Sequence, residues 1–267
     1  MIRNLIARDR PRADGAQPVR SVVPASAPVP APVHVSVPRY AVPAYFNPLW
    51  DATGWQVLAA LGPAVSFAIL NPDSGPGRAV DSAYSEPIGA VQASGGRVIG
   101  YVDTAYGRRP SATVLRDLMR YQSWYGLRGV FLDQVASGRD HLAHYRRIIE
   151  AARRCGFEFF AINPGVIPDP GYVELADVVV TFEGPWLAYR DHAAVDWTTD
   201  HPAERFCHLV HSTPPEELAT ARNLARERHV GAFYVTEQSG ANPWGSLSTQ
   251  LAQTAAVGRA SVTSPLP

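Results

Sequence analysis

Short apolar runs, each followed by a polar residue, alternate with longer amphipathic segments between residues 40 and 237 of this 267-residue chain. Such alternation is typical of βα units arranged around a parallel sheet. Eight units can be counted, and eight close into a barrel that commonly takes about 250 residues. The sequence therefore predicts an α/β fold, a (β/α)8 TIM-type barrel. The predicted strands are residues 41–46, 65–70, 97–102, 129–132, 158–162, 178–182, 206–210 and 232–235.

Four segments between or after these strands carry helix signals. Ser111 is the predicted N-cap of one helix, and Asp140 opens another whose apolar residues recur at helical spacing. Prolines and first-turn acids precede a third helix at Leu218, and residues 247–257 supply a closing helix. These helices fit the outer ring of the predicted barrel.

Composition divides the chain into three parts. Residues 1–39 contain recurring prolines, which favour extended chain and cannot pack a core, so we expect a disordered Pro-rich tail. Residues 40–257 hold the predicted barrel, and residues 258–267 form a predicted disordered C-terminal tail. The first residues lack the apolar core of a secretory signal, so we expect a cytoplasmic protein unless a nonclassical route exports it.

Charge and cysteine content exclude several classes of partner. The 24 basic residues balance 24 acidic ones, so the chain is not expected to attract nucleic acid or an anionic membrane surface. Runs of 18 or more apolar residues do not occur, so no membrane-spanning helix is expected. Cys155 and Cys207 lie beside apolar runs and are predicted to be buried free thiols. No cofactor is expected, and the oligomeric state is left open.

A polar side chain follows every predicted strand. Active sites of such barrels lie at the carboxyl ends of the strands, so these residues are candidates for the site. In chain order they are Asn47, Asn71, Asp103, Asp133, Asn163, Glu183, His211 and Glu237. Because alternate strands point into the same layer, Asp133 and Glu183 are predicted to converge. Paired carboxylates held by a rigid sheet suit general acid and base chemistry, as in glycoside hydrolases.

Structural roles are the alternative for the same residues. Asp133 could cap the turn after its strand or pair with Arg128 or Arg139. Glu183 could pair with Arg190. Trp186 follows Glu183 closely and could form an apolar wall that raises the carboxyl pKa. The aromatic residues near strand ends either stack on sugar rings or belong to the core. They are Tyr45, Tyr101, Tyr106, Trp186 and Trp244. No compact ligand motif of the His-Glu-x-x-His kind occurs, so no catalytic metal is expected.

Nine segments together resemble one known family. They are residues 42–48, 71–77, 100–110, 129–133, 162–165, 180–184, 210–212, 235–237 and 242–244. In this order they resemble the spherulation-specific family 4, or spherulin-4-like, proteins, some of which are classed as glycoside hydrolase family 135. The resemblance covers the chain from about residue 40 to about residue 253 and leaves out the Pro-rich tail.

The resemblance implies a (β/α)8 barrel and, as in the characterised hydrolases, endo-acting cleavage of α-1,4-linked galactosamine polymers. In those enzymes an Asp-Glu pair ends the fourth strand and a Glu ends the sixth. Asp133 and Glu183 would then inherit the two main roles, as nucleophile or base and as proton donor. Gln134 replaces the second acid of the pair, and an amide can bind a sugar but cannot exchange a proton at neutral pH. Asp103 stands where relatives carry a histidine.

The leading hypothesis is a glycoside hydrolase that cleaves an amino-sugar polysaccharide with catalytic Asp133 and Glu183. The partner is then a polysaccharide or oligosaccharide substrate. The predicted substrate-binding residues are Tyr45, Asn47, Asn71, Tyr101, Asp103, Tyr106, Gln134, Asn163, Trp186, His211, Glu237 and Trp244. One alternative is a catalytically weakened relative that binds a glycan or serves as a structural protein. Another is a barrel hydrolase with a different substrate, because a fold does not determine chemistry.

Overall fold

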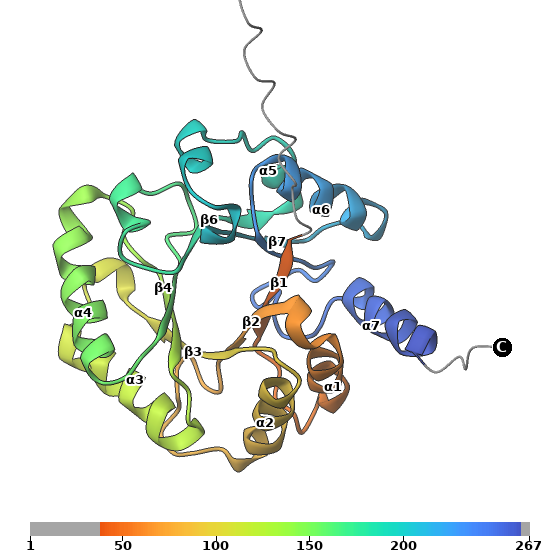
Figure 1. The fold of residues 1–267 in the computed structure, drawn as a ribbon, viewed down its shortest axis with the longest axis horizontal. Coiled ribbons are helices and arrows are strands. Elements are labelled where there is room, and N and C mark those ends of the chain that lie inside the picture. The colour runs from red at the N-terminus through yellow and green to blue at the C-terminus, as the bar shows by residue number, and fades with distance from the viewer. Residues whose placement is uncertain (1–37, 263–267) are drawn as a thin grey trace, which may run out of the picture. The chain divides into compact units, whose positions relative to one another are not determined.

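A computed structural model describes residues 38–262 of the chain, with side chains as far as residue 255. Within this part each strand pairs in parallel with the next, and β8 pairs with β1, so the sheet is a closed barrel (Figure 1). The strands are β1 (Arg39–Ala44), β2 (Val65–Leu70), β3 (Val98–Asp103), β4 (Gly129–Asp133), β5 (Phe159–Ile162), β6 (Val178–Pro185), β7 (Phe206–His211) and β8 (Ala232–Val235). The predicted (β/α)8 barrel is confirmed.

The described part of the chain contains seven α-helices, which surround the strands in Figure 1. They are α1 (Ala52–Leu61), α2 (Ser85–Ala93), α3 (Ser111–Tyr125), α4 (Leu142–Arg154), α5 (Trp186–Arg190), α6 (Leu218–Glu227) and α7 (Thr249–Val262). Helix α7 packs beside α1 and so closes the ring (Figure 1). The connection from β5 to β6 carries only the 3-10 turn Pro170–Tyr172 in place of a helix. Prolines at 164, 168 and 170 lack the N–H groups that a helix requires there.

Several boundaries differ from the prediction. Strand β1 begins at Arg39, whose backbone N–H donates to the Gly231 carbonyl at 2.9 Å, and it ends at Ala44. Ser111 is the first residue of α3, and Pro110 holds the cap position without a side-chain hydrogen bond. Helix α7 continues to Val262, so the predicted C-terminal tail begins as helix. Residues 263–267 and the predicted N-terminal tail before residue 38 lie outside the described residues.

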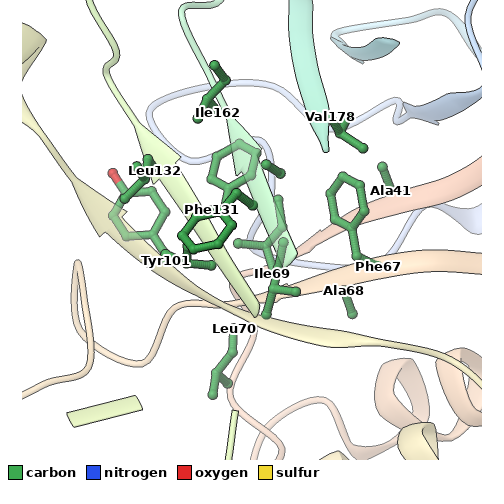
Figure 2. Close-up of a cluster of buried hydrophobic side chains, with 14 of the residues drawn as sticks. Ala41, Phe67, Ala68, Ile69, Leu70, Tyr101, Phe131, Leu132, Ile162 and Val178 are labelled. Atoms are coloured by element: carbon green, nitrogen blue, oxygen red, sulfur yellow. The ribbon is translucent and has the colours of Figure 1, made fainter. Parts of the chain in front are cut away.

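Aromatic side chains fill the interior of the barrel. The ring centroids of Phe67 on β2 and Phe159 on β5 lie 5.7 Å apart, although these strands are not neighbours. Tyr101 on β3 stacks over Phe131 on β4 with centroids 6.4 Å apart. Figure 2 shows Phe67, Tyr101 and Phe131 within one cluster of buried side chains. Burying each large apolar side chain contributes about 1.5–3 kcal/mol to the free energy of folding. The packed interior therefore fixes the strands relative to one another, and with them the residues at their carboxyl ends.

Helix α3 lies close against the barrel because β3 contains Gly100. A Cβ atom at this position would lie 2.4 Å from the ring of Tyr121, far inside van der Waals contact. The close approach also lets the Tyr121 hydroxyl donate to the Leu70 carbonyl at 3.1 Å. The helix is therefore tied to β2 and β3, the strands that precede two of the loops at the carboxyl end of the barrel.

The two cysteines are free thiols, but only one is buried. Cys207 lies inside β7, whereas Cys155 is exposed at the C-cap of α4. The prediction of two buried thiols is therefore wrong for Cys155, because it lies in the exposed turn between buried Ala152 and buried Phe157. Among the described helices, none combines the length and the apolar character needed to cross a membrane.

Candidate active site

The carboxyl ends of β4, β5 and β6 bring two acids and one amide together. Asp133 is the last residue of β4, Glu183 lies near the end of β6, and Asn163 directly follows β5. The Asn163 Nδ2 atom donates to Asp133 Oδ1 at 2.7 Å and also to Glu183 Oε2. One amide nitrogen therefore contacts both carboxyl groups, which lie 50 residues apart in the sequence.

The shared amide limits the separation of the two acids. Two hydrogen bonds of about 2.9 Å that meet at one nitrogen place their acceptors no more than about 6 Å apart. Retaining glycosidases hold their two carboxyl groups about 5–5.5 Å apart, whereas inverting enzymes need about 6.5–9.5 Å to admit a water. The separation of these two oxygens, Asp133 Oδ1 and Glu183 Oε2, is compatible with the retaining geometry.

Tyrosines surround Asp133 on its other side. The Tyr101 hydroxyl donates to Asp133 Oδ2 at 2.7 Å, and the ring of Tyr45 meets that of Tyr101 edge-on at 5.6 Å. Burial and the charge of Asp133 raise the pKa of both phenols, so each keeps its proton. Burial also raises the pKa of Asp133, while hydrogen bonds from Tyr101 and Asn163 act in the opposite direction. Both oxygens of Asp133 therefore accept a hydrogen bond that favours its ionised form.

Glu183 is the acid that holds a proton near neutral pH. Burial, and then repulsion from Asp133, raise the pKa of Glu183 from 4.5 to about 7. Hydrogen bonds from Asn163 and from the Trp244 side chain lower it in part. Two neighbouring carboxyl groups with different surroundings can act as a proton donor and an ionised partner.

Two cavities meet at this pair of acids. The larger, of about 660 Å³, is lined by Tyr45, Asn71, Pro72, Asp73, Ser74, Asp133, Glu183, His211, Gly240, Ala241, Asn242, Pro243 and Trp244. The smaller, of about 260 Å³, is lined by Tyr106, Asp133, Gln134, Asn163, Pro164, Gly165 and Glu183. Because both contain Asp133 and Glu183, a ligand that fills both cavities would cross the two carboxyl groups.

A sequence model of the spherulation-specific family 4 matches residues 39–257 of the chain. The chain belongs to the spherulation-specific family 4. Spherulin-4 of Physarum polycephalum is 29% identical over 237 residues, which cover 84% of this chain and 69% of that protein. The crystal structure of Aspergillus clavatus Sph3 in complex with GalNAc matches with a TM-score of 0.70 and 23% identity. That match covers 82% of this chain and 96% of Sph3, and it shows a shared fold.

Most of the predicted site residues of this family 4 chain line one of the two cavities. Besides the two acids they are Tyr45, Asn71, Tyr106, Gln134, Asn163, His211 and Trp244. His211 and Trp244 pack edge-to-face with ring centroids 5.7 Å apart, and burial lowers the pKa of His211, which keeps it neutral at pH 7. Tyr101 lines neither cavity but donates to Asp133. Within residues 38–255, no three His, Cys, Asp or Glu side chains are grouped to hold a metal ion.

Trp186 does not lie at the family 4 site. It is the first residue of α5 and is buried in a cluster with Phe182 and Tyr189, with its ring 6.4 Å from that of Tyr189. The interpretation of Trp186 as the wall beside Glu183 is therefore not supported. Trp244, which returns from the loop after β8, holds that position, and its hydrogen bond lowers the carboxyl pKa.

Asn47, Asp103 and Glu237 line neither cavity and make structural contacts. The Asn47 side chain donates to Asp81 at 3.2 Å, and Asp103 accepts from the backbone N–H of Ala105. Glu237 accepts from the backbone N–H of Thr249 at 2.9 Å and thereby caps α7. Strand β8 ends at Val235, so Glu237 belongs to the loop that leads to α7.

The sequence analysis did not single out three polar residues of the larger cavity. Asp73 and Ser74 belong to the loop after β2, and Asn242 belongs to the loop after β8. Asn71 shapes the first loop by accepting from the Gly75 backbone N–H at 2.8 Å. All three residues lie within segments that carry the family resemblance, which is the signal that could have identified them.

Proposed function

We propose that this family 4 chain is a glycoside hydrolase that cleaves an amino-sugar polysaccharide with Asp133 and Glu183. The observation that carries the proposal is the single Asn163 amide that contacts both carboxyl groups where two cavities meet. The complex of Sph3 with GalNAc supports N-acetylgalactosamine or galactosamine as the sugar. The two cavities support endo-acting cleavage, since sugar units can lie on both sides of the acids.

In the proposed reaction Glu183 donates its proton to the glycosidic oxygen as the bond to the anomeric carbon breaks. An ionised oxygen of Asp133 forms a bond with that carbon, which gives a covalent glycosyl ester. Ionised Glu183 then takes a proton from water, and the water oxygen attacks the anomeric carbon and releases Asp133. Each acid returns to its starting state, and the sugar keeps its anomeric configuration.

The neighbouring residues support these roles. Asn163 and Tyr101 donate to opposite oxygens of Asp133, which orients the carboxylate and favours its charge. Burial gives Glu183 a pKa of about 7, close to the value at which a group both donates and accepts protons efficiently.

Gln134 is the observation that favours a second candidate, a weakened relative that binds the glycan without cleaving it. Its side chain lines the smaller cavity at the position where the resemblance implies a third acid. If that acid is required for turnover, the chain binds sugar but does not hydrolyse it.

The experiment incubates the full-length protein with galactosamine-rich exopolysaccharide and measures new reducing ends. Hydrolysis should occur, and Asp133→Asn or Glu183→Gln should each reduce the rate by about 10²-fold or more. Glu150→Gln, an exposed change on α4, is the matched control and should keep the parental rate. Binding without new reducing ends, together with activity that appears in Gln134→Glu, would select the second candidate. Parental rates in both amide variants would exclude the proposed roles of the two acids.

A further inference from the structure

We propose that the smaller cavity is a separate sugar subsite that recognises an N–H donor, from an ammonium or an acetamido group, of an amino sugar. This inference rests on the proposed function, which names an amino-sugar polysaccharide as the ligand. It adds an assignment of the recognising atoms, which are Asn163 Oδ1, the Gln134 amide and the ring of Tyr106.

The Asn163 side chain provides a buried acceptor without a partner. Its Nδ2 atom donates to both Asp133 and Glu183, so a flipped amide would turn its oxygen against two carboxyl oxygens. Asn163 is 4% exposed, and its Oδ1 atom has no hydrogen-bond partner among the described residues. Buried polar atoms in native proteins are nearly always satisfied, so this acceptor is suited to a donor on a ligand.

The unpartnered oxygen lies beside Gly165, a residue that lines the smaller cavity. A Cβ atom placed on Gly165 would lie 3.8 Å from Asn163 Oδ1 and 3.8 Å from Glu183 Cβ. Gly165 lines the smaller cavity and not the larger one. A sugar in this cavity would therefore reach Oδ1 while its neighbour in the polymer lies at the two acids.

Two other lining residues of the smaller cavity have a left-handed backbone. Tyr106 has φ 54° and Gln134 has φ 48°, conformations that are costly for residues other than glycine and that cluster at ligand sites. The Tyr106 N–H donates to the Gln134 carbonyl at 2.6 Å, and the Thr104 hydroxyl donates to the same oxygen at 2.7 Å. These bonds lock the loops after β3 and β4 together.

The locked loops hold two side chains ready for a ligand. Tyr106 is 51% exposed, so one ring face can stack on a sugar. The Gln134 side-chain amide forms no hydrogen bond within residues 38–255, so it can bind a hydroxyl or an N–H group. The glutamine that replaces the expected third acid therefore has a binding role in this subsite.

The charge of the cavity favours a nitrogen donor. Its lining contains the carboxyl groups of Asp133 and Glu183 and no basic side chain. The guanidinium of Arg108 lies 5.9 Å from the Tyr106 ring centroid, but Arg108 does not line the cavity. Hydrogen bonds with a charged donor are about twice as strong as neutral ones, so an ammonium group should form the strongest hydrogen bond with Asn163 Oδ1. The N–H of an acetamido group is neutral but can also donate to Oδ1.

The test measures calorimetric Kd values of the full-length protein for three sets of α-1,4-linked oligosaccharides, made of galactosamine, N-acetylgalactosamine or galactose. Both amino-sugar ligands should bind about 10-fold tighter than the galactose ligand. Tyr106→Ala and Asn163→Ala should each weaken amino-sugar binding by about 10-fold. Glu150→Gln is again the control.

The binding constants decide this proposal whether or not the protein cleaves the oligosaccharides. Equal affinity for the galactose ligand would overturn the recognition of nitrogen, and unchanged affinity in both Tyr106→Ala and Asn163→Ala would overturn the subsite. If Asn163→Ala does not fold, Tyr106→Ala decides, because this side chain is half exposed. Binding that follows the expected pattern without new reducing ends would support the subsite and exclude the hydrolase.

Discussion

Replacing Glu183 by glutamine should stabilise the protein at alkaline pH. Burial and the charge of Asp133 raise the pKa of Glu183 from 4.5 to about 7. One pKa unit corresponds to 1.36 kcal/mol, so the ionised side chain is disfavoured by about 3 kcal/mol. Because Glu183 is partly exposed in the cavities, screening by water reduces the expected effect to about 2–3 kcal/mol.

The sign follows from the protons bound in each state. Between pH 4.5 and about 7 the folded protein holds a proton on Glu183 that the unfolded chain has lost. The free energy of unfolding therefore falls as pH rises through this window, and the loss is complete above it. Glutamine does not titrate, so Glu183→Gln should match the parent near pH 4.5 and exceed it above about pH 8.

Urea unfolding of both proteins, followed by circular dichroism at about pH 5 and about pH 8.5, measures the difference. At the higher pH the free energy of unfolding of Glu183→Gln should exceed that of the parent by about 2–3 kcal/mol. A thermal scan at the same pH should show a midpoint raised by about 4–12 °C, given about 2–4 °C per kcal/mol for a domain of this size. Glu150→Gln should show no pH-dependent difference from the parent. A Glu183→Gln protein that gains no stability between the two pH values would refute a raised pKa at Glu183.

Two further changes test the neighbours of the site. Trp244→Phe keeps a ring beside His211 but removes the hydrogen bond that lowers the pKa of Glu183, so the alkaline limb of the pH–rate profile should move to higher pH; an unmoved limb would contradict this contact. Glu237→Ala removes the acceptor for the Thr249 N–H at the start of α7 and should reduce the free energy of unfolding by about 1 kcal/mol, with sugar affinity unchanged in the same calorimetric titration. A loss of affinity would instead place Glu237 in the binding site.

The barrel could be predicted from the sequence because its information is local. Strand-like runs and helical periodicity depend on residues a few positions apart, and eight repeats of a βα unit leave few ways to close a sheet. The same regularity indicated that Asp133, Asn163 and Glu183 end strands of one sheet. The incomplete repeat between β5 and β6 was missed, although its prolines were visible in the sequence.

Which strand-end residues face the cavities depended on boundaries that the sequence does not define. Strand β1 ends at Ala44, so Tyr45 lines the larger cavity, whereas Asn47 turns toward Asp81. The prediction ended this strand at residue 46, two residues too late, so Asn47 was taken as the residue at the strand end, whereas it lies three residues beyond β1. The bounds of β8 were predicted correctly, but Glu237 lies two residues beyond its end, in a loop where the carboxylate accepts from Ser248 and Thr249.

The sequence by itself determined the barrel and the position of Asp133 and Glu183 toward the carboxyl ends of its strands. Apolar periodicity and residue type, on which both depend, can be read from the chain alone. Only the tertiary structure decided that Trp244, 61 residues beyond Glu183, lies beside it in place of Trp186. It also decided that one Asn163 amide contacts both acids and that burial raises the pKa of Glu183. Hydrogen bonds, burial and charge repulsion depend on distances in space, and segments far apart in the sequence acquire those distances only when the barrel closes.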